Sequence, residues 1–559
     1  MFYYVGMYLR RISRKNKNGS ETAYLQLAHN EWDPQTRCAK AKVIYSFGRE
    51  DELDRAALKR LVESISRYLT PGETIRAQGN AGRTDIEYVS SRSFGGVWAL
   101  EGLWKQLGMA KLISQLFRGK ERHTNLERLL FAMVANRALS PSSKLAMEDW
   151  VKDDAYIEGL PSLNSDQLYR AMDELLGVKD GLEEQVYWAA ADLMNLEVDL
   201  LYFDTTSSYF EVEGSEIPEG DALRRPGYSK DKRPDLAQVV IGMAVTREGI
   251  PVRSWVWPGN TADMSVVEEV KRDLVGWKLG RVISVMDRGF SSEENLRTLQ
   301  RAGGHYIVGE KMRSGKPETE EALSKGGRYH RIRDNLQVKE ILIGDGEGRR
   351  RLLLAFNPRE AEKQRKERAA ILKALAEELG SIRQLPDALH TKAMCRLRTH
   401  GLYSKYLTQL KDGTLKISQA AVREAERYDG KYLIRTSDDT LSSEDAVLGY
   451  KQLADVEDAF RTLKTTLVLR PMYHRLEDRI RSHILLCWLA LLLVRVAEVR
   501  TGDSWRNIRR ELERLHIGFF KSKDGSFCQT TSLTTNQSTI LKDLGVEKPP
   551  KLLQIATKP

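Results

Sequence analysis

A run of short apolar segments that begins near residue 198 constrains the fold of this chain more than any other feature. Segments of strand length, bounded by turn residues, alternate with helical patterns in the order βββαβαβ. The expected strands are Asp199–Thr205, Ala237–Thr246, Pro251–Trp257, Arg281–Met286 and His305–Val308, and the expected helices are Met264–Leu274 and Glu293–Ala302. This order predicts an α/β core in which helices pack on a mixed sheet.

The rest of the chain divides around this core, which we interpret as ribonuclease-H-like. A helical pattern from Ser443 through Val496 predicts helices that return to the core sheet. The helices expected before the core form either a domain that binds DNA ends or a helical packing domain. The predicted parts are a small β-rich region with a helix (1–75), the helical domain (76–196), the first part of the core (197–310), a large, partly β insertion (311–440), the C-terminal core helices (441–500) and a C-terminal tail (501–559).

Charge and composition restrict the partners of the chain. Its 559 residues include 88 Lys and Arg against 78 Asp and Glu, a net charge of +10, which favours a polyanionic partner. Four scattered cysteines without a Cys-x-x-Cys pair indicate a reducing cytoplasm and no zinc site. The most apolar run, Ile484–Val494, is about half the roughly 20 residues that cross a bilayer. It predicts a buried helix, so no membrane partner is expected.

Two acidic residues lie in or at the end of predicted core strands. Asp204 follows Leu-Tyr-Phe, and Asp287 follows Ser-Val-Met. A carboxylate in such a place is costly to desolvate unless it is paired, hydrogen-bonded or bound to a metal ion. For either residue alone, the alternative is an Asp that caps the following turn or helix. Together the two residues are candidates for one acidic site.

A third acid, Glu457, comes from the helical pattern after the insertion. At about 100° per residue, Tyr450, Glu457, Arg461 and Lys464 fall on one narrow stripe beside the apolar face. Glu457 is therefore better placed than its acidic neighbours to reach the sheet. The alternative is a solvated face on which Glu457 forms an ordinary ion pair with Arg461.

Three carboxylates that meet in this way suit divalent metal chemistry. Mg²⁺ prefers hard oxygen ligands. Two such ions about 4 Å apart activate the oxygen that attacks a phosphodiester and stabilise the oxygen that leaves it. Asp204, Asp287 and Glu457 are therefore the predicted catalytic residues and metal ligands. The same site hydrolyses DNA or joins it, depending on whether water or a DNA end is the nucleophile.

These motifs resemble a known family. Tyr450-x2-Leu453-x3-Glu457-x6-Lys464 is similar to the Tyr-x2-Arg-x3-Glu-x6-Lys signature of DDE-type bacterial insertion-sequence transposases, which carry an insertion before the catalytic Glu. Tyr-Phe-Asp204-Thr-Thr and Met-Asp287-Arg-Gly-Phe resemble the first two catalytic blocks of that family. The segments 227–235 (Gly-Tyr-Ser-Lys-Asp-Lys-Arg-Pro-Asp) and 258–263 (Pro-Gly-Asn-Thr-Ala-Asp) also look like motifs of the group.

The resemblance implies a DNA transposase that cleaves transposon ends and transfers the strands into target DNA. It implies two Mg²⁺ ions, with Mn²⁺ able to substitute, double-stranded DNA carrying terminal inverted repeats, a homodimer in the synaptic complex, and a nucleoid-associated bacterial protein. Tyr450 and Lys464 are carried over as DNA contacts. Leu453 departs from the signature Arg, which leaves the hairpin intermediate of the family open, and Arg461 is the predicted substitute phosphate contact.

Further cations are candidates for DNA contacts. Lys230, Lys232 and Arg233 lie in the loop before the second strand, where clustered cations gain free energy by releasing counterions from DNA. Lys311 and Arg313 follow the last core strand at the start of the insertion. For each, the alternative is a solvated surface charge. Two other functions stay open: a structure-specific nuclease of the same fold, and a DNA-binding regulator derived from a transposase, which would be expected to have lost an acid.

Overall fold

The structure is a computed structural model in which two compact units are distinguished. The first unit comprises Met1–Val89, Phe520–Ser526 and Ala556–Pro559, and the second comprises Ser90–Phe519 and Phe527–Ile555. Arg281, expected to begin a strand, lies outside the described residues. The structure describes residues 7–15, 21–33, 35–36, 38–66, 68, 86–117, 125–196, 199–211, 222–277, 282–313, 315–470, 472–522 and 525–557.

The first unit contains an antiparallel sheet of three strands and one amphipathic helix. The strands are β1 (Met7–Lys15), β2 (Glu21–Asp33) and β3 (Cys38–Arg49), in the order β1-β2-β3, and the helix is α1 (Arg55–Ser66). The small sheet and the following helix agree with the sequence pattern of this region.

A nine-stranded sheet organises the second unit, in the order β10-β11-β12-β15-β9-β8-β5-β6-β7. Strand β6 pairs antiparallel with β5 and with β7, whereas β8 and β9 run parallel to β5. These strands match the predicted order βββαβαβ, with α9 (Val267–Val275) and α10 (Glu293–Gln300) between them. The strands are β5 (Leu200–Tyr209), β6 (Gln238–Val245), β7 (Pro251–Pro258), β8 (Ile283–Met286) and β9 (His305–Glu310).

Both faces of these strands are buried, which explains why they read as nearly continuous apolar runs. On β5, Leu201 and Phe203 face the side where α9 and α10 pack, together with the buried Trp255 and Trp257 of β7. Leu200 and Tyr202 face the other side and share a core with the later helices. Asp204 is two residues after Tyr202 and so points to the same face, toward the C-terminal helices.

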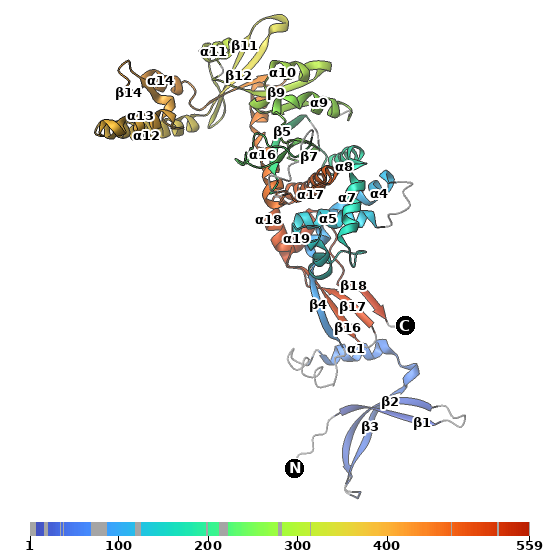
Figure 1. The fold of residues 1–559 in the computed structure, drawn as a ribbon. Helices are drawn as coiled ribbons and strands as arrows, with labels where there is room; N and C mark the ends of the chain where they lie inside the picture. The colour runs from blue at the N-terminus through green and yellow to red at the C-terminus, as the bar shows by residue number, and fades with distance from the viewer. Residues whose placement is uncertain are drawn as a thin grey trace. The chain divides into compact units, whose positions relative to one another are not determined.

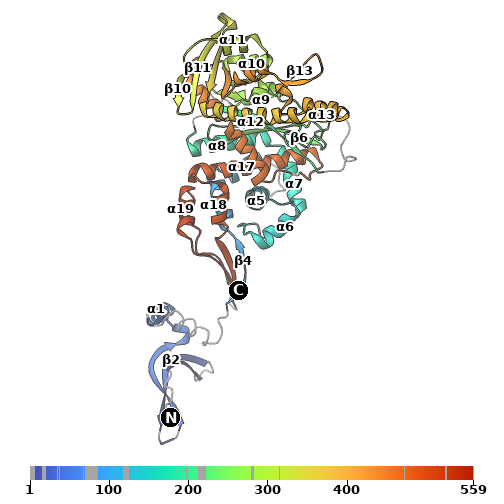
Figure 2. The same cartoon turned by 90° about the vertical axis from the view of Figure 1, so that its left-hand side faces the viewer.

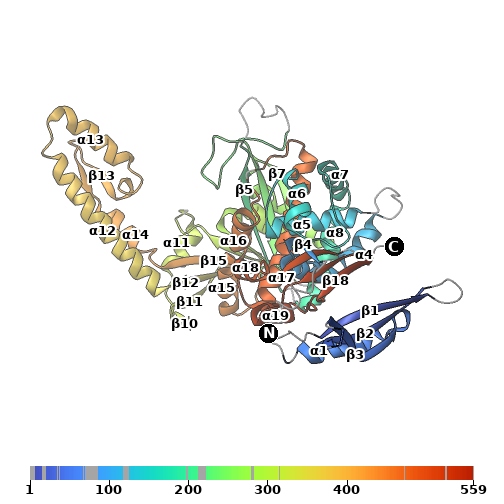
Figure 3. The same ribbon diagram turned by 90° about the horizontal axis from the view of Figure 1, so that it is seen from below.

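The insertion extends the sheet and adds a small subdomain. Strand β15 pairs antiparallel with β9, and β12, β11 and β10 follow outward. Beyond them, α12, α13, β13 and β14 stand away from the sheet (Figure 3) and surround an apolar core of their own. The elements are α11 (Pro317–Ser324), β10 (His330–Arg333), β11 (Leu336–Ile343), β12 (Arg350–Phe356), α12 (Pro358–Ile382), α13 (Asp387–Thr399), β13 (Leu407–Gln409), β14 (Leu415–Ile417), α14 (Gln419–Glu426) and β15 (Lys431–Thr436).

The helices before the core share one hydrophobic cluster with the C-terminal helices. The long helix α17 (Glu477–Thr501) packs along α5 and α7 (Figure 1). It is long and apolar enough to cross a membrane, but 83% of its apolar window is buried inside the protein, as in a core helix. The earlier helices are α3 (Gly95–Gln106), α4 (Met109–Leu116), α5 (Leu126–Leu139), α6 (Ala146–Asp149), α7 (Ser165–Leu176) and α8 (Lys179–Met194).

The C-terminal residues are ordered rather than a featureless tail. Helices α18 (Trp505–Leu512) and α19 (Thr535–Asp543) lie beside α17 (Figures 1 and 2). A four-stranded sheet has the order β18-β17-β16-β4. Its strands are β4 (Glu87–Ser93), β16 (His516–Ser522), β17 (Gly525–Thr530) and β18 (Leu552–Thr557).

The single helix assumed for the stripe from Tyr450 to Lys464 is divided in the structure. Helix α15 (Ser443–Lys451) ends before α16 (Ala454–Arg461), and a π-helical turn, Thr462–Thr466, follows. At the junction, the amides of Gln452 and Leu453 bond to carbonyls three residues earlier, which tightens the chain into a turn. The stripe expected from one straight helix is therefore wrong, because Tyr450 and Glu457 lie on different helices.

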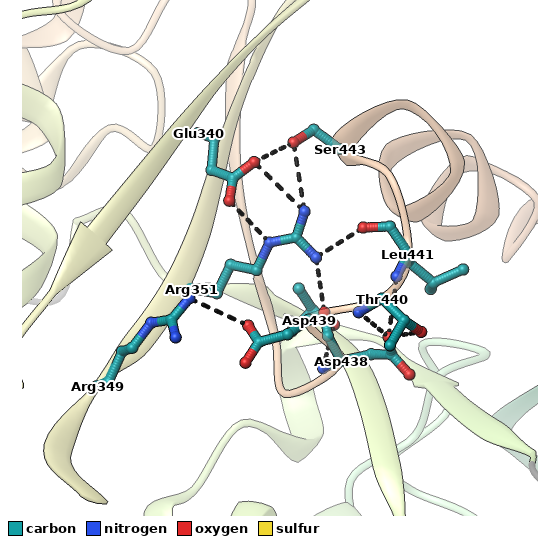
Figure 4. A network of polar contacts seen from close by, with 9 residues as sticks. Glu340, Arg349, Arg351, Asp438, Asp439, Thr440, Leu441 and Ser443 are labelled. Carbon is teal, nitrogen blue, oxygen red and sulfur yellow. Dashed lines mark hydrogen bonds and ion pairs between the residues drawn. The ribbon is translucent and has the colours of Figure 1, made fainter. Parts of the chain in front are cut away.

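A buried arginine connects the insertion to the start of α15 (Figure 4). The Arg351 guanidinium on β12 donates to Glu340 on β11 (3.0 Å) and to the backbone oxygens of Asp438 (2.6 Å) and Leu441 (2.8 Å). Ser443, the first residue of α15, lies 3.5 Å from the same group. The strands of the insertion thus fix the loop from which α15 leaves the sheet.

Candidate active site

The two predicted Asp residues lie side by side because of the strand register. In the parallel pair β5 and β8, Phe203 is the partner of Met286, so Asp204 and Asp287 are the next residues on neighbouring strands. Adjacent strands are about 4.8 Å apart. The two residues therefore meet where β8 ends beside the continuing strand β5, at an acidic edge that joins residues far apart in the sequence.

Asp204 is in an environment that disfavours its charge. Burial raises the pKa of Asp204 to about 6, and the carboxylates of Asp263 and Asp287 add to the rise. The amide of Thr205 donates to Asp204 at 2.7 Å, and the Lys230 ammonium lies 3.8 Å away; both oppose the rise. Burial is the largest cause, so the charged form of Asp204 is poorly solvated, a cost that a bound cation relieves.

Helices α15 and α16 bring two signature residues to this edge. The Tyr450 hydroxyl donates to Oδ1 of Asp287 at 3.2 Å. The Tyr202 hydroxyl on β5 donates to Gln452 at 2.9 Å, which attaches the junction of the two helices to the strand that carries Asp204. Glu457, on α16, lines the same cavity as Asp287 and Tyr450.

This cavity has a volume of about 980 Å³ and extends from the acidic residues to the insertion. Asp287, Tyr450 and Glu457 line one part of it, and residues of α12 and of the segment before β15 line another. Six cations lie on its wall: Arg288, Lys311, Arg313, Arg368, Lys405 and Lys431. The arrangement places positive charge around an acidic centre, which suits a polyanionic substrate that reacts at that centre.

Lys311 and Arg313 were expected at the mouth of the insertion, and both line this cavity. The guanidinium of Arg313 lies 4.9 Å from the centre of the Tyr428 ring, a cation–π distance. The predicted contact of both cations with DNA phosphates remains a prediction.

Lys230 is not directed outward as a loop cation. Its ammonium contacts the backbone oxygen and Oγ1 of Thr205, each at 2.7 Å, and lies 3.2 Å from Asp263. The loop thus turns Lys230 into the acidic cluster, because the unpaired carboxylates there attract it. The expected contact between Lys230 and DNA is not what this geometry favours.

Lys464 is also engaged within the protein. Its ammonium forms a 2.8 Å ion pair with Asp231, which also binds Arg470 at 2.6 Å. Burial lowers the pKa of Lys464, while Asp231 opposes that shift. Lys464 and Asp231 are 12% and 10% exposed, so this pair joins the loop before β6 to the segment after Glu457.

The remaining predicted DNA contacts lie on the surface. Arg461 is 68% exposed and pairs with Asp458 rather than with Glu457. Lys232 is exposed, and Arg233 pairs with Asp235 at 2.8 Å while lying over the Tyr209 ring. All three are accessible, and their roles in DNA binding stay predictions.

Asp263 is an acid of this site that the sequence reasoning did not assign. Its carboxylate accepts a hydrogen bond from Thr205 Oγ1 at 2.5 Å and pairs with Lys230. The signal was its place at the end of the 258–263 motif. That motif packs against the 227–235 motif backbone to backbone, since a Cβ on Gly227 would lie 2.0 Å from the carbonyl oxygen of Gly259.

The donor chemistry of the site fits a divalent cation. The charges of Asp263 and Asp287 act on the Asp204 carboxylate, and such hard oxygens are the ligands that Mg²⁺ prefers. Over the described ranges, no three Asp, Glu, His or Cys side chains are arranged closely enough to enclose a metal ion. The carboxylates thus fit the ion by charge and ligand type, and the Lys230 ammonium lies beside two of them.

The fold and the site define an α/β enzyme whose acidic centre borders a cavity suited to a polyanion. Residues 207–493, just over half of the chain, match the family described as Transposase DDE domain, and the chain belongs to this family. It is a DDE transposase. Residues 9–75 match the N-terminal domain of IS1634 family transposases, which supports an insertion-sequence transposase. Asp204 lies just ahead of the DDE match.

Among solved structures, the chain is similar to the piggyBac transposase in a synaptic complex with hairpin DNA. The identity is 10%, the TM-score is 0.34, and the match covers 74% of this chain and 76% of that chain. No curated protein matches the sequence significantly.

Proposed function

We propose that this transposase cleaves DNA at transposon ends and joins the freed strands to target DNA, acting as a dimer that brings two ends together. In this proposal its core is ribonuclease-H-like, and Asp204, Asp287 and Glu457 hold two divalent cations, Mg²⁺ or Mn²⁺. When bound, such ions activate the attacking oxygen and stabilise the leaving oxygen of a phosphodiester.

The observation that carries the proposal is the meeting of distant acids at one cavity. Asp287 from the end of β8 and Glu457 from α16 line the same cavity, and Asp204 is the next residue across the sheet from Asp287. The strand order β7-β6-β5-β8-β9, with β8 and β9 parallel to β5, supports a ribonuclease-H-like core.

The other residues of the site have supporting roles in this reaction. Tyr450 orients the Asp287 carboxylate through its hydroxyl group. Lys311 and Arg313 are placed to neutralise phosphates along the cavity, and Arg288 follows Asp287 directly. The DNA therefore enters between the acidic edge of the sheet and the insertion, where its backbone meets positive charge on both sides of the reacting bond.

The experiment is cleavage and strand transfer of a labelled DNA that carries the repeats flanking the gene, with Mg²⁺. Wild type is compared with Asp287→Asn and Glu457→Gln, which keep the side-chain size and remove the charge. Asp458→Asn is the matched control, because Asp458 lies next to Glu457 on α16 but does not line the cavity and pairs with Arg461.

We expect wild type and Asp458→Asn to cut at the repeat ends and to join the freed 3′-hydroxyl to a target, and both active-site variants to lose at least about a hundredfold in rate. Cleavage without joining would favour a structure-specific nuclease. Binding of the ends without cleavage by wild type would favour a DNA-binding regulator. Full activity of both active-site variants would refute the assignment of these acids.

A further inference from the structure

The loop before β6 inserts a lysine into the acidic centre of the enzyme. The Lys230 ammonium has four oxygen neighbours: the carbonyl and hydroxyl of Thr205 at 2.7 Å each, Asp263 at 3.2 Å and Asp204 at 3.8 Å. These are the kinds of oxygen ligand that a metal ion takes, and an ammonium group is the one cationic side chain compact enough to sit among them.

The position of Lys230 is held by its own backbone and by the next residue. Its own amide donates to Ser207 Oγ on β5 at 2.9 Å. The next residue, Asp231, forms ion pairs with Lys464 and Arg470, which follow α16 in the chain. The lysine is therefore a fixed part of the site and not a mobile surface chain that has folded inward.

Asp263 is the partner that keeps the ammonium in place. Its two carboxylate oxygens divide their contacts, since Oδ1 accepts from Thr205 and Oδ2 pairs with Lys230. The side chains of Lys230 and Asp263 are 30% and 31% exposed, so the pair lies at the edge of the site where a solvated ion enters.

We propose that Lys230 is a positioning residue that acts as the internal counter-cation of the acidic centre, anchored by Asp263, and that a divalent cation binding at Asp204 must displace its ammonium. The inference rests on the proposed metal-dependent function. Its consequence is that Lys230 sets the metal affinity: the site keeps its carboxylates together without metal, and binds metal more weakly than the carboxylates alone would.

The test is Mn²⁺ binding to the full-length protein without DNA, measured by the electron paramagnetic resonance signal of free Mn²⁺. We compare wild type with Lys230→Met, which keeps the aliphatic length without the charge, and with Lys230→Gln, which keeps a polar end for Thr205. Lys232→Met, which removes an exposed cation two residues away, is the matched control.

We expect Lys230→Met and Lys230→Gln to bind Mn²⁺ at least about tenfold more tightly than wild type, because a competing unit charge near the carboxylates is gone. Lys232→Met is expected within about twofold of wild type. Melting curves by circular dichroism show whether each variant is folded. If Lys230→Met is not folded, the comparison is made with Lys230→Gln.

Two outcomes overturn the idea in different ways. If wild type binds Mn²⁺ and both neutral variants bind it no more tightly, the counter-cation role is refuted and the proposed metal-dependent function stands. If neither wild type nor any variant binds Mn²⁺, the proposed metal site itself fails.

Discussion

The hydroxyl group of Tyr450 donates a hydrogen bond to the carboxylate of Asp287 across 3.2 Å, so that α15 orients the acid at the end of β8. Burial raises the pKa of Tyr450, so the hydroxyl keeps its proton and remains a donor. A Cβ on Gly309 of β9 would lie 2.2 Å from the same hydroxyl oxygen, which shows how closely the ring is enclosed.

Tyr450→Phe removes this donor without changing the shape of the ring. We expect the rate of strand cleavage to fall about tenfold, as the loss of a hydrogen bond to a charged group implies, while binding of DNA ends changes little. The measurement is single-turnover cleavage with binding followed by fluorescence anisotropy. Tyr432→Phe is the control, since its ring lies beside that of Tyr450 but its buried hydroxyl has no hydrogen-bond partner among the described residues. An equal loss in both variants would contradict the orienting role.

Asp204 predicts how stability depends on pH. Its folded pKa of about 6 lies above its ordinary value of 3.8, so the protonated form favours folding. This contribution is complete below about pH 4 and is lost as the pH rises through about 6. Asp204→Asn should therefore stabilise the metal-free protein at pH 7.5, by as much as about 3 kcal/mol, and should make no such difference at pH 4. Urea denaturation in EDTA at the two pH values measures this; a destabilised variant at pH 7.5 would contradict it.

The Arg351 network predicts a stability difference between two neighbouring arginines. Arg351 is 7% exposed and donates hydrogen bonds to Glu340 and to the backbone carbonyls of Asp438 and Leu441. Arg351→Met therefore leaves these acceptors without this donor. We expect a loss of about 3 kcal/mol in the free energy of unfolding. Arg349→Met is the control, because Arg349 is 48% exposed and its pair with Asp439 spans 3.5 Å; its loss should stay below about 1 kcal/mol. Similar losses in both variants, measured by urea denaturation, would show that the network does not hold the start of α15.

Much of the core was predictable because local patterns determine it. Turn residues and apolar runs located the strands from β5 to β9. The break between α15 and α16 was not predictable, because no Gly or Pro lies at Gln452 or Leu453 and the turn depends on tertiary packing.

The acids of the site were visible in the sequence, but their partners were not. Asp204 lies within an apolar strand and Asp287 directly follows one, which is a local signal. The pairing of Asp231 with Lys464 joins segments more than 200 residues apart, and no pattern within either segment indicates it. The same applies to Lys230, whose neighbours in sequence are the solvated cations of a surface loop, whereas its neighbours in space are carboxylates.

Lys311 provides a test of the cavity as the path of the DNA backbone. Lys311→Met removes one cation from the wall that also carries Asp287 and Glu457. If its ammonium neutralises a phosphate, the slope of log K against log salt should fall by about 1, with a similar loss for any DNA sequence.

Arg461→Met is the comparison, because Arg461 is 68% exposed, pairs with Asp458 and does not line that cavity. We measure the slopes by anisotropy with Ca²⁺ in place of Mg²⁺. A reduced slope in Lys311→Met alone supports passage of the backbone between the sheet edge and the insertion. A reduced slope in Arg461→Met alone would instead place the backbone along the outer face of α16, and would restore the phosphate contact expected there from the missing signature arginine.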